Sequence, residues 1–136
     1  MPAKLLVDTS AWIVSFRKSG HEQLKKTLVA ALDSLPVATT NIVILELLQG
    51  CRNRNEYDAM HARLKVLETI LINDAVWFLA YTTGYELRRK GITVPTLDII
   101  IASAAKIHNC SLLHHDKHFR ILAKHLHINA VDYIDD

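Results

Sequence analysis

Four acidic residues end or interrupt apolar runs of the sequence, at positions where a carboxylate could do chemistry: Asp8, Glu46, Asp98 and Asp116. Each has an ordinary explanation when taken alone. Asp8 and Asp116 could merely cap helices, and Asp98 could stabilise a first helical turn. Glu46 could lie on the wet side of an amphipathic helix. As a group they are unusual, because carboxylates that converge on one crevice raise each other's pKa and oppose folding unless a cation lies among them.

This donor set favours a hard divalent cation. Carboxylates without Cys or His at ligand spacing suit Mg²⁺ or Mn²⁺ better than Zn²⁺. Such a cation neutralises charge on a phosphate and lowers the pKa of a bound water, and two cations together hold both the attacking and the leaving oxygen. The reaction that fits these residues is metal-assisted hydrolysis of a phosphodiester bond.

Short apolar runs that alternate with amphipathic segments predict the elements that position these acids. The strands are expected at residues 4–7, 36–39, 70–72, 111–114 and 128–131. The helices are expected at residues 9–17, 21–35, 42–51, 54–67, 75–90, 98–108 and 116–125. Thr9 or Ser10 is expected to cap the first helix, and Asn41 the third.

Alternation of strands and helices predicts an α/β fold. We expect a central parallel β-sheet of four to five short strands, flanked by helices on both faces and joined by right-handed crossovers. Parallel strands present their carboxyl ends at the same edge of the sheet, where ligands bind in open α/β folds. Asp8 and Asp116 are therefore expected to leave the sheet side by side.

Length and composition set broader limits. The chain has 136 residues, of which 50% are hydrophobic and 22% charged, so we expect one globular domain over residues 1–136. Cys51 and Cys110 form no metal-like pair and are expected to be reduced, buried thiols of a cytoplasmic protein without a secretory signal. No apolar run approaches the roughly 18 residues of a membrane span. The net charge of +2 identifies no partner, and basic pairs such as Arg17-Lys18 are more typical of solvated helix ends.

Six of the eight histidines lie between residues 108 and 127, and three of them surround Asp116: His114, His115 and His118. Two roles are open, a transition-metal site, because imidazole binds Zn, Ni or Cu, or a contact with phosphate and a proton transfer near neutral pH. No specific ligand spacing is present. The plainer expectation is a set of surface histidines on the last helix, and we assign them no role.

Four segments carry a family resemblance, in this order: Leu-Val-Asp-Thr-Ser-Ala-Trp (6–12), Glu-Leu-Leu-Gln-Gly (46–50), Asp-Ile-Ile-Ile-Ala (98–102) and Leu-Leu-His-His-Asp-Lys-His-Phe (112–119). Together they resemble the PIN-domain ribonucleases, most closely the VapC toxins of bacterial type II toxin–antitoxin pairs, over nearly the whole chain. The resemblance implies a set of metal-binding and catalytic acids, with Ser10 in support: Asp8, Glu46, Asp98 and, least securely matched, Asp116.

The last segment departs from the family pattern. The family usually has Thr or Ser at the position of His114 and a second Asp at the position of His118. This departure affects two expectations. One is that Asp116 matches the fourth acid of the family, and the other is that a second metal binds.

The resemblance implies a Mg²⁺- or Mn²⁺-dependent endoribonuclease that hydrolyses RNA, such as structured tRNA, with a metal-activated water. It also implies a small antitoxin protein that blocks the site, and a homodimer. The alternative is a non-catalytic module of the same fold that binds RNA or protein. Two other enzyme classes fit less well. A phosphatase of the haloacid dehalogenase type needs a second Asp where Ser10 stands, and a phosphotransfer receiver needs an adjacent acid pair at the first strand.

Overall fold

The computed structural model describes residues 4–134, and its strands form one parallel sheet in the order β3-β2-β1-β4-β5. The strands are β1 (Lys4–Val7), β2 (Val37–Thr39), β3 (Glu68–Thr69), β4 (Cys110–Leu113) and β5 (Ala130–Val131). The helices are α1 (Thr9–Ser15), α2 (Glu22–Ser34), α3 (Asn41–Gln49), α4 (Arg54–Lys65), α5 (Asp74–Arg89), α6 (Thr96–Ile107) and α7 (Lys117–Leu126). The predicted α/β class, with a parallel sheet of short strands, is confirmed.

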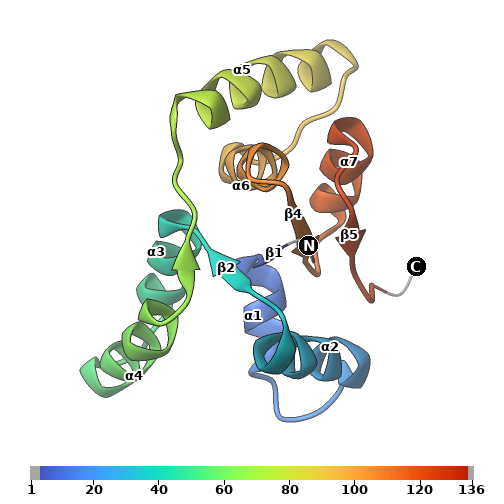
Figure 1. The fold of residues 1–136 in the computed structure, drawn as a ribbon. Helices are drawn as coiled ribbons and strands as arrows, with labels where there is room; N and C mark the ends of the chain where they lie inside the picture. The colour runs from blue at the N-terminus through green and yellow to red at the C-terminus, as the bar shows by residue number, and fades with distance from the viewer. Residues whose placement is uncertain (1–3, 135–136) are drawn as a thin grey trace.

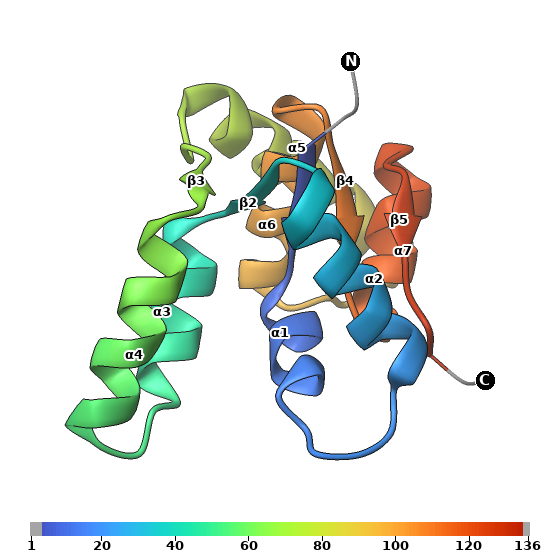
Figure 2. The ribbon, with the colours of Figure 1, turned by 60° about the horizontal axis from the view of Figure 1, so that its bottom comes forward.

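Helices cover the two faces of the sheet. In Figure 1, α5, α6 and α7 lie above the strands, and α1, α2 and α4 lie below them. The turned view in Figure 2 shows α3 and α4 side by side next to the edge strand β3, with α1 and α2 beside them. This arrangement follows from right-handed crossovers, because the chain moves outward from β1 to β3 through α1–α4 and returns to β4 and β5 through α5–α7.

The two central strands are apolar because helices bury both of their faces. Leu6, Val7, Leu112 and Leu113 are all fully buried, and the register pairs Leu6 with Leu112 and Val7 with Leu113. The Asp8 N–H then donates to the Leu113 carbonyl at 2.9 Å. The carboxyl ends of β1 and β4 therefore lie side by side, which is the placement that the sequence predicts for Asp8.

The third strand lies earlier in the chain than the sequence predicts. The pairing with β2 involves Glu68 and Thr69, not residues 70–72. Ile70 is still buried, and its N–H donates to the Thr39 carbonyl at 2.9 Å, but Leu71 is exposed as the chain leaves the sheet. The prediction was wrong because apolar character marks Ile70, which is buried in the hydrophobic core, whereas the ladder at this sheet edge is formed by two polar residues.

The two caps expected from the sequence were wrong, but the alternative interpretation of Asp8 as a helix cap is confirmed. Asp8 caps α1 by accepting from the Ser10 N–H, and Thr40 caps α3 by accepting from the Val43 N–H at 3.1 Å. In both cases the capping residue directly precedes the one proposed from the sequence, because several polar residues are adjacent there and only the backbone angle of one of them is extended.

The cysteines match their prediction in part. Both are free thiols, and Cys110 is buried on β4, but Cys51 is only half-buried just after α3. Among residues 4–134, no helix combines the length and the apolar character needed to cross a bilayer.

Candidate functional site

Asp8 lies at the carboxyl end of β1 with 3% of its surface exposed. Its Oδ2 accepts from the Ser10 N–H at 2.9 Å and from the Ser10 hydroxyl at 2.6 Å. The Ser10 Oγ in turn accepts from the His115 N–H at 2.9 Å, so Ser10 joins the ends of β1 and β4. Burial raises the pKa of Asp8, while the two hydrogen bonds from Ser10 oppose that rise. Asp8 is thus both a helix cap and a buried acid, and its two interpretations from sequence are compatible.

Glu46 is half-buried in the middle of α3 and does not lie on a fully wet face. Its Oε1 accepts from the Thr9 hydroxyl at 2.8 Å. Thr9 belongs to the first turn of α1, directly after Asp8, so α1 orients two of the four acids at once. The sequence interpretation gave Thr9 no such role, and its position next to Asp8 is the only signal that could have indicated one.

Asp98 lies in the first turn of α6, where the helix dipole favours an anion. Its pKa is nevertheless raised to about 7. Burial is the main cause, followed by the negative charges of Asp8 and Asp116, with a further contribution from Glu46. The structure therefore brings the other three predicted acids close enough to Asp98 for their charges to act on it.

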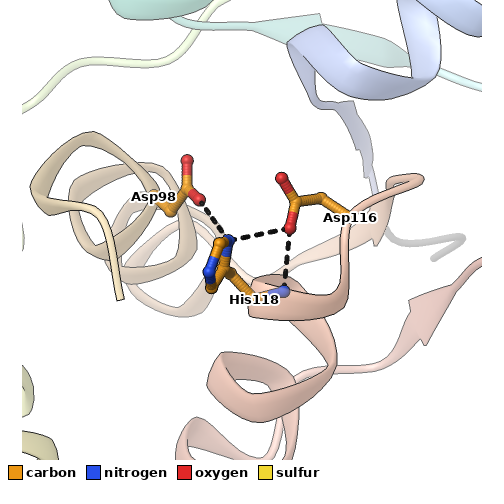
Figure 3. Close-up of side chains that lie close together, drawn as sticks. All are labelled: Asp98, Asp116 and His118. Atoms are coloured by element: carbon orange, nitrogen blue, oxygen red, sulfur yellow. Dashed lines mark hydrogen bonds and ion pairs between the residues drawn. The ribbon is translucent and has the colours of Figure 1, made fainter. Parts of the chain in front are cut away.

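Asp116 caps α7 at the carboxyl end of β4, where its Oδ1 accepts from the His118 N–H at 2.8 Å. The His118 side chain folds back toward the acids (Figure 3). Its Nδ1 lies 2.9 Å from the Asp116 Oδ1 and 3.7 Å from the Asp98 Oδ2. One donor atom from each of these three residues falls within 4.8 Å of the other two. Imidazole is therefore part of this acidic cluster, whereas the sequence interpretation assigned the histidines near Asp116 no role.

The expectation of surface histidines on the last helix was wrong for His114. This residue precedes the loop to α7 and is fully buried. Its Nδ1 accepts from the Asp116 N–H at 3.3 Å, and its Nε2 lies 3.5 Å from the Asp132 Oδ2. Burial lowers the pKa of His114, which keeps the ring neutral and its Nδ1 available as an acceptor. His114 thus supports the backbone that carries Asp116.

The donor set fits a divalent cation. Burial and the charges of three nearby carboxylates raise the pKa of Asp98, so its ionised form is disfavoured without a cation. A cation would reverse this effect, because positive charge nearby favours the ionised form of each carboxyl group. Four carboxylates and one imidazole offer oxygen and nitrogen ligands together, whereas no thiol belongs to the cluster.

A groove adjoins the cluster on the side of Glu46. It lies between α1, α3 and α4, has a volume of about 520 Å³, and is lined mainly by apolar groups, including Ile13, Phe16, Leu47 and Met60. Arg63 lies along it. The groove therefore leads from an apolar surface to one of the four acids.

The family model described as the PIN domain matches residues 5–125. The chain is 26% identical over 132 residues to the VapC ribonuclease Mb1587 of Mycobacterium bovis, covering 95% of this chain and 98% of the relative. Ribonuclease VapC11 of Mycobacterium tuberculosis matches to the same extent.

Solved structures with the same fold include VapBC2 from Rickettsia felis, bound to a DNA fragment from its promoter. It gives a TM-score of 0.78 at 20% identity, over 96% of this chain and 98% of that one. VapBC-1 from nontypeable Haemophilus influenzae also gives a TM-score of 0.78, at 17% identity, over 95% and 97% of the two chains. The resemblance seen in the sequence is confirmed, and the chain belongs to the PIN domain family.

Proposed function

We propose that this protein is a metal-dependent endoribonuclease and the toxin of a toxin–antitoxin pair. Its catalytic and metal-binding acids are Asp8, Glu46, Asp98 and Asp116. The observation that carries the proposal is the cluster at one edge of the sheet, where Asp98, Asp116 and His118 offer donor atoms within 4.8 Å of one another. Burial raises the pKa of Asp98 within it, and the charges of Asp8, Asp116 and Glu46 add to that rise. Membership of the PIN family and the similarity to proteins named VapC ribonucleases support the same activity.

A bound divalent cation, Mg²⁺ or Mn²⁺, supplies positive charge to the scissile phosphate and lowers the pKa of a water molecule. The residues of the chain hold the ligands in place before substrate arrives. Ser10 fixes the Asp8 carboxylate with two hydrogen bonds, and Thr9 fixes Glu46 with one. The cap bond from the His118 N–H orients Asp116. Such preorganisation lowers the barrier because little rearrangement is left for the transition state.

RNA cleavage tests the proposal directly. Purified protein is incubated with total RNA in Mg²⁺, in Mn²⁺ or in EDTA, as wild type and as Asp8→Asn and Asp98→Asn. We expect cleavage by the wild type only with a metal, and none by either variant, although both fold. Asp74→Asn is the matched control, because Asp74 is an exposed first-turn acid of α5 outside the cluster.

Full activity of both cluster variants would refute the assignment of the acids. Binding of RNA without cleavage in either metal would favour the alternative, a non-catalytic module of the same fold. We expect structured RNA such as tRNA to be the substrate, and a panel of purified tRNAs and rRNA fragments would identify the cut sites.

The proposed antitoxin occupies the groove between α1, α3 and α4. The apolar lining of the groove suits an amphipathic segment, and a segment laid along it would cover Glu46. Solved structures named VapBC have the same fold as this chain. We expect the product of a short open reading frame beside the gene to co-purify with the wild type. Phe16→Glu should abolish co-purification while RNA cleavage persists, because Phe16 lines the groove outside the acid cluster.

We further propose a single domain over residues 1–136 that works as a homodimer in the cytoplasm. The exposed face of α5 supports dimerisation, since Phe78, Tyr81 and Tyr85 are each about two-thirds exposed there. Light scattering after gel filtration should give twice the chain mass. Tyr81→Glu should halve it, and an unchanged mass in that variant would place the interface elsewhere.

A further inference from the structure

We infer that His118 is a nitrogen ligand of the metal site and that this site therefore prefers a first-row transition-metal ion such as Mn²⁺ to Mg²⁺. The inference rests on the proposed nuclease site and concerns which ion it selects. Mg²⁺ is bound by oxygen ligands, while an imidazole ligand suits transition metals. Carboxylates alone do not distinguish Mg²⁺ from Mn²⁺. The imidazole of His118 therefore determines which of the two ions the site prefers.

The distances within the cluster are those of atoms that share one ion. Metal–ligand bonds of about 2.1 Å place neighbouring ligands of an octahedral ion roughly 3 Å apart and opposite ligands roughly 4.2 Å apart. The His118 Nδ1 lies 2.9 Å from the Asp116 Oδ1 and 3.7 Å from the Asp98 Oδ2, within that range. A simple surface ion pair requires contact with only one carboxylate. The His118 nitrogen instead faces two carboxylates, those of Asp98 and Asp116 (Figure 3).

The orientation of the ring supports the same role. The Nδ1 atom is buried, yet among the described residues it has no hydrogen-bond partner with acceptable geometry, despite its short approach to Asp116. A buried nitrogen with two carboxylate oxygens nearby and no aligned hydrogen bond is suited to direct its lone pair at an ion that the oxygens share.

The backbone around His118 keeps the ring in this place. Its N–H is fixed by the cap bond to Asp116, and the next residue, Phe119, is fully buried. Asp98 and His118 belong to the first turns of α6 and α7, which pack against each other. The ring is therefore positioned by two anchored helix ends and not by a mobile loop.

The presence of His at position 118, where the resemblance leads us to expect Asp, has a chemical consequence. The family usually has Asp at the position of His118, which would make the set of ligands all oxygen. Replacing His118 by Asp restores that set. The variant His118→Asp is thus the natural comparison, and His118→Asn serves as a second variant if the added charge prevents folding.

Nitrogen coordination is measured with the full chain, labelled with ¹⁵N-histidine and loaded with Mn²⁺, by electron spin-echo envelope modulation. Isothermal titration with Mn²⁺ and with Mg²⁺ gives the ratio of their affinities. We expect a ¹⁵N coupling in the wild type and its loss in both His118 variants. The affinity for Mn²⁺ divided by the affinity for Mg²⁺ should fall by about tenfold or more in His118→Asp. His125→Asn is the control, because His125 lies on the same helix but contacts Glu86 instead.

A ¹⁵N coupling that survives in both His118 variants, or a ratio of affinities equal in wild type and His118→Asp, would overturn the inference. So would a wild type that binds neither ion. The nuclease proposal has its own readout, since RNA cleavage by His118→Asp in Mg²⁺ with an unchanged ratio would refute the role of His118 and leave the nuclease standing. A ¹⁵N coupling in a wild type that cleaves no RNA would refute the nuclease proposal and leave His118 as a metal ligand.

Discussion

Replacing Asp98 by Asn should make the metal-free protein more stable at neutral and alkaline pH. Burial raises the pKa of Asp98 most, the charges of Asp8, Asp116 and Glu46 raise it further, and the charge of His118 lowers it. Because the pKa in the folded chain is raised, the favourable contribution of this group is complete below the ordinary value of 3.8 and is lost as the pH rises through about 7. Asn cannot ionise, so the variant avoids that loss.

The size of the effect follows from the shift. A pKa raised from 3.8 to about 7 corresponds to about 4 kcal/mol of folding free energy once the group is ionised. Loss of a first-turn charge at α6 offsets up to about 1 kcal/mol of this. The net gain for the variant is therefore about 3 kcal/mol at pH 8, or roughly 10 °C in melting temperature for a chain of this size. At pH 4 the gain falls to nearly zero.

Thermal unfolding in EDTA from pH 4 to pH 8 measures this difference for wild type, Asp98→Asn and the control Asp74→Asn. The melting temperature of Asp98→Asn should rise above that of the wild type progressively with pH, while the control stays close to the wild type throughout. Millimolar Mg²⁺ or Mn²⁺ should raise the melting temperature of the wild type more than that of the variant. A variant that is no more stable than the wild type at pH 8 would refute the view that burial and the neighbouring carboxylates disfavour the ionised form of Asp98.

Two further changes test the supports of the cluster. Ser10→Ala removes the hydroxyl that donates to Asp8 and accepts from the His115 N–H, and should reduce the free energy of unfolding by about 1–2 kcal/mol in urea. Ser34→Ala, at an exposed site, should change it far less, and equal effects would contradict the role of Ser10. Arg120→Met removes two hydrogen bonds to the Asp132 carboxylate, whose pKa Arg120 holds below its usual range, so it should cost about 1–3 kcal/mol at pH 7. That loss should shrink as the pH falls through the lowered pKa of Asp132, and the same loss at pH 2.5 and pH 7 would exclude this ion pair as its cause.

The parts of the fold that could be predicted are those where burial alone decides. β1 and β4 are central strands enclosed by helices, so their uninterrupted apolar residues mark them in the sequence. β3 lies at an edge and pairs through Glu68 and Thr69, and no apolar pattern marks such a strand. The hydrophobic signal therefore located the middle of the sheet and misplaced the edge strand β3.

The site shows the same division. Position along the chain predicts that Asp8 and Asp116 leave neighbouring strands, because that depends only on topology. Position does not predict the direction of a first-turn side chain, and the imidazole of His118 could have turned toward solvent. Its place among the acids depends on the cap bond at Asp116 and on the packing of α7 against α6, which only the folded structure reveals.

The contact between Ser10 and His115 joins residues 105 positions apart, and it has a consequence for the order of events during synthesis. A ribosome that has released the chain only as far as α5 has delivered Asp8 and Glu46, but neither Asp98 nor Asp116. Long-range strand pairing of this kind is slow, because the intervening chain must be ordered first. The acid cluster cannot assemble until β4 and the first turn of α7 have left the ribosome and β4 has paired with β1.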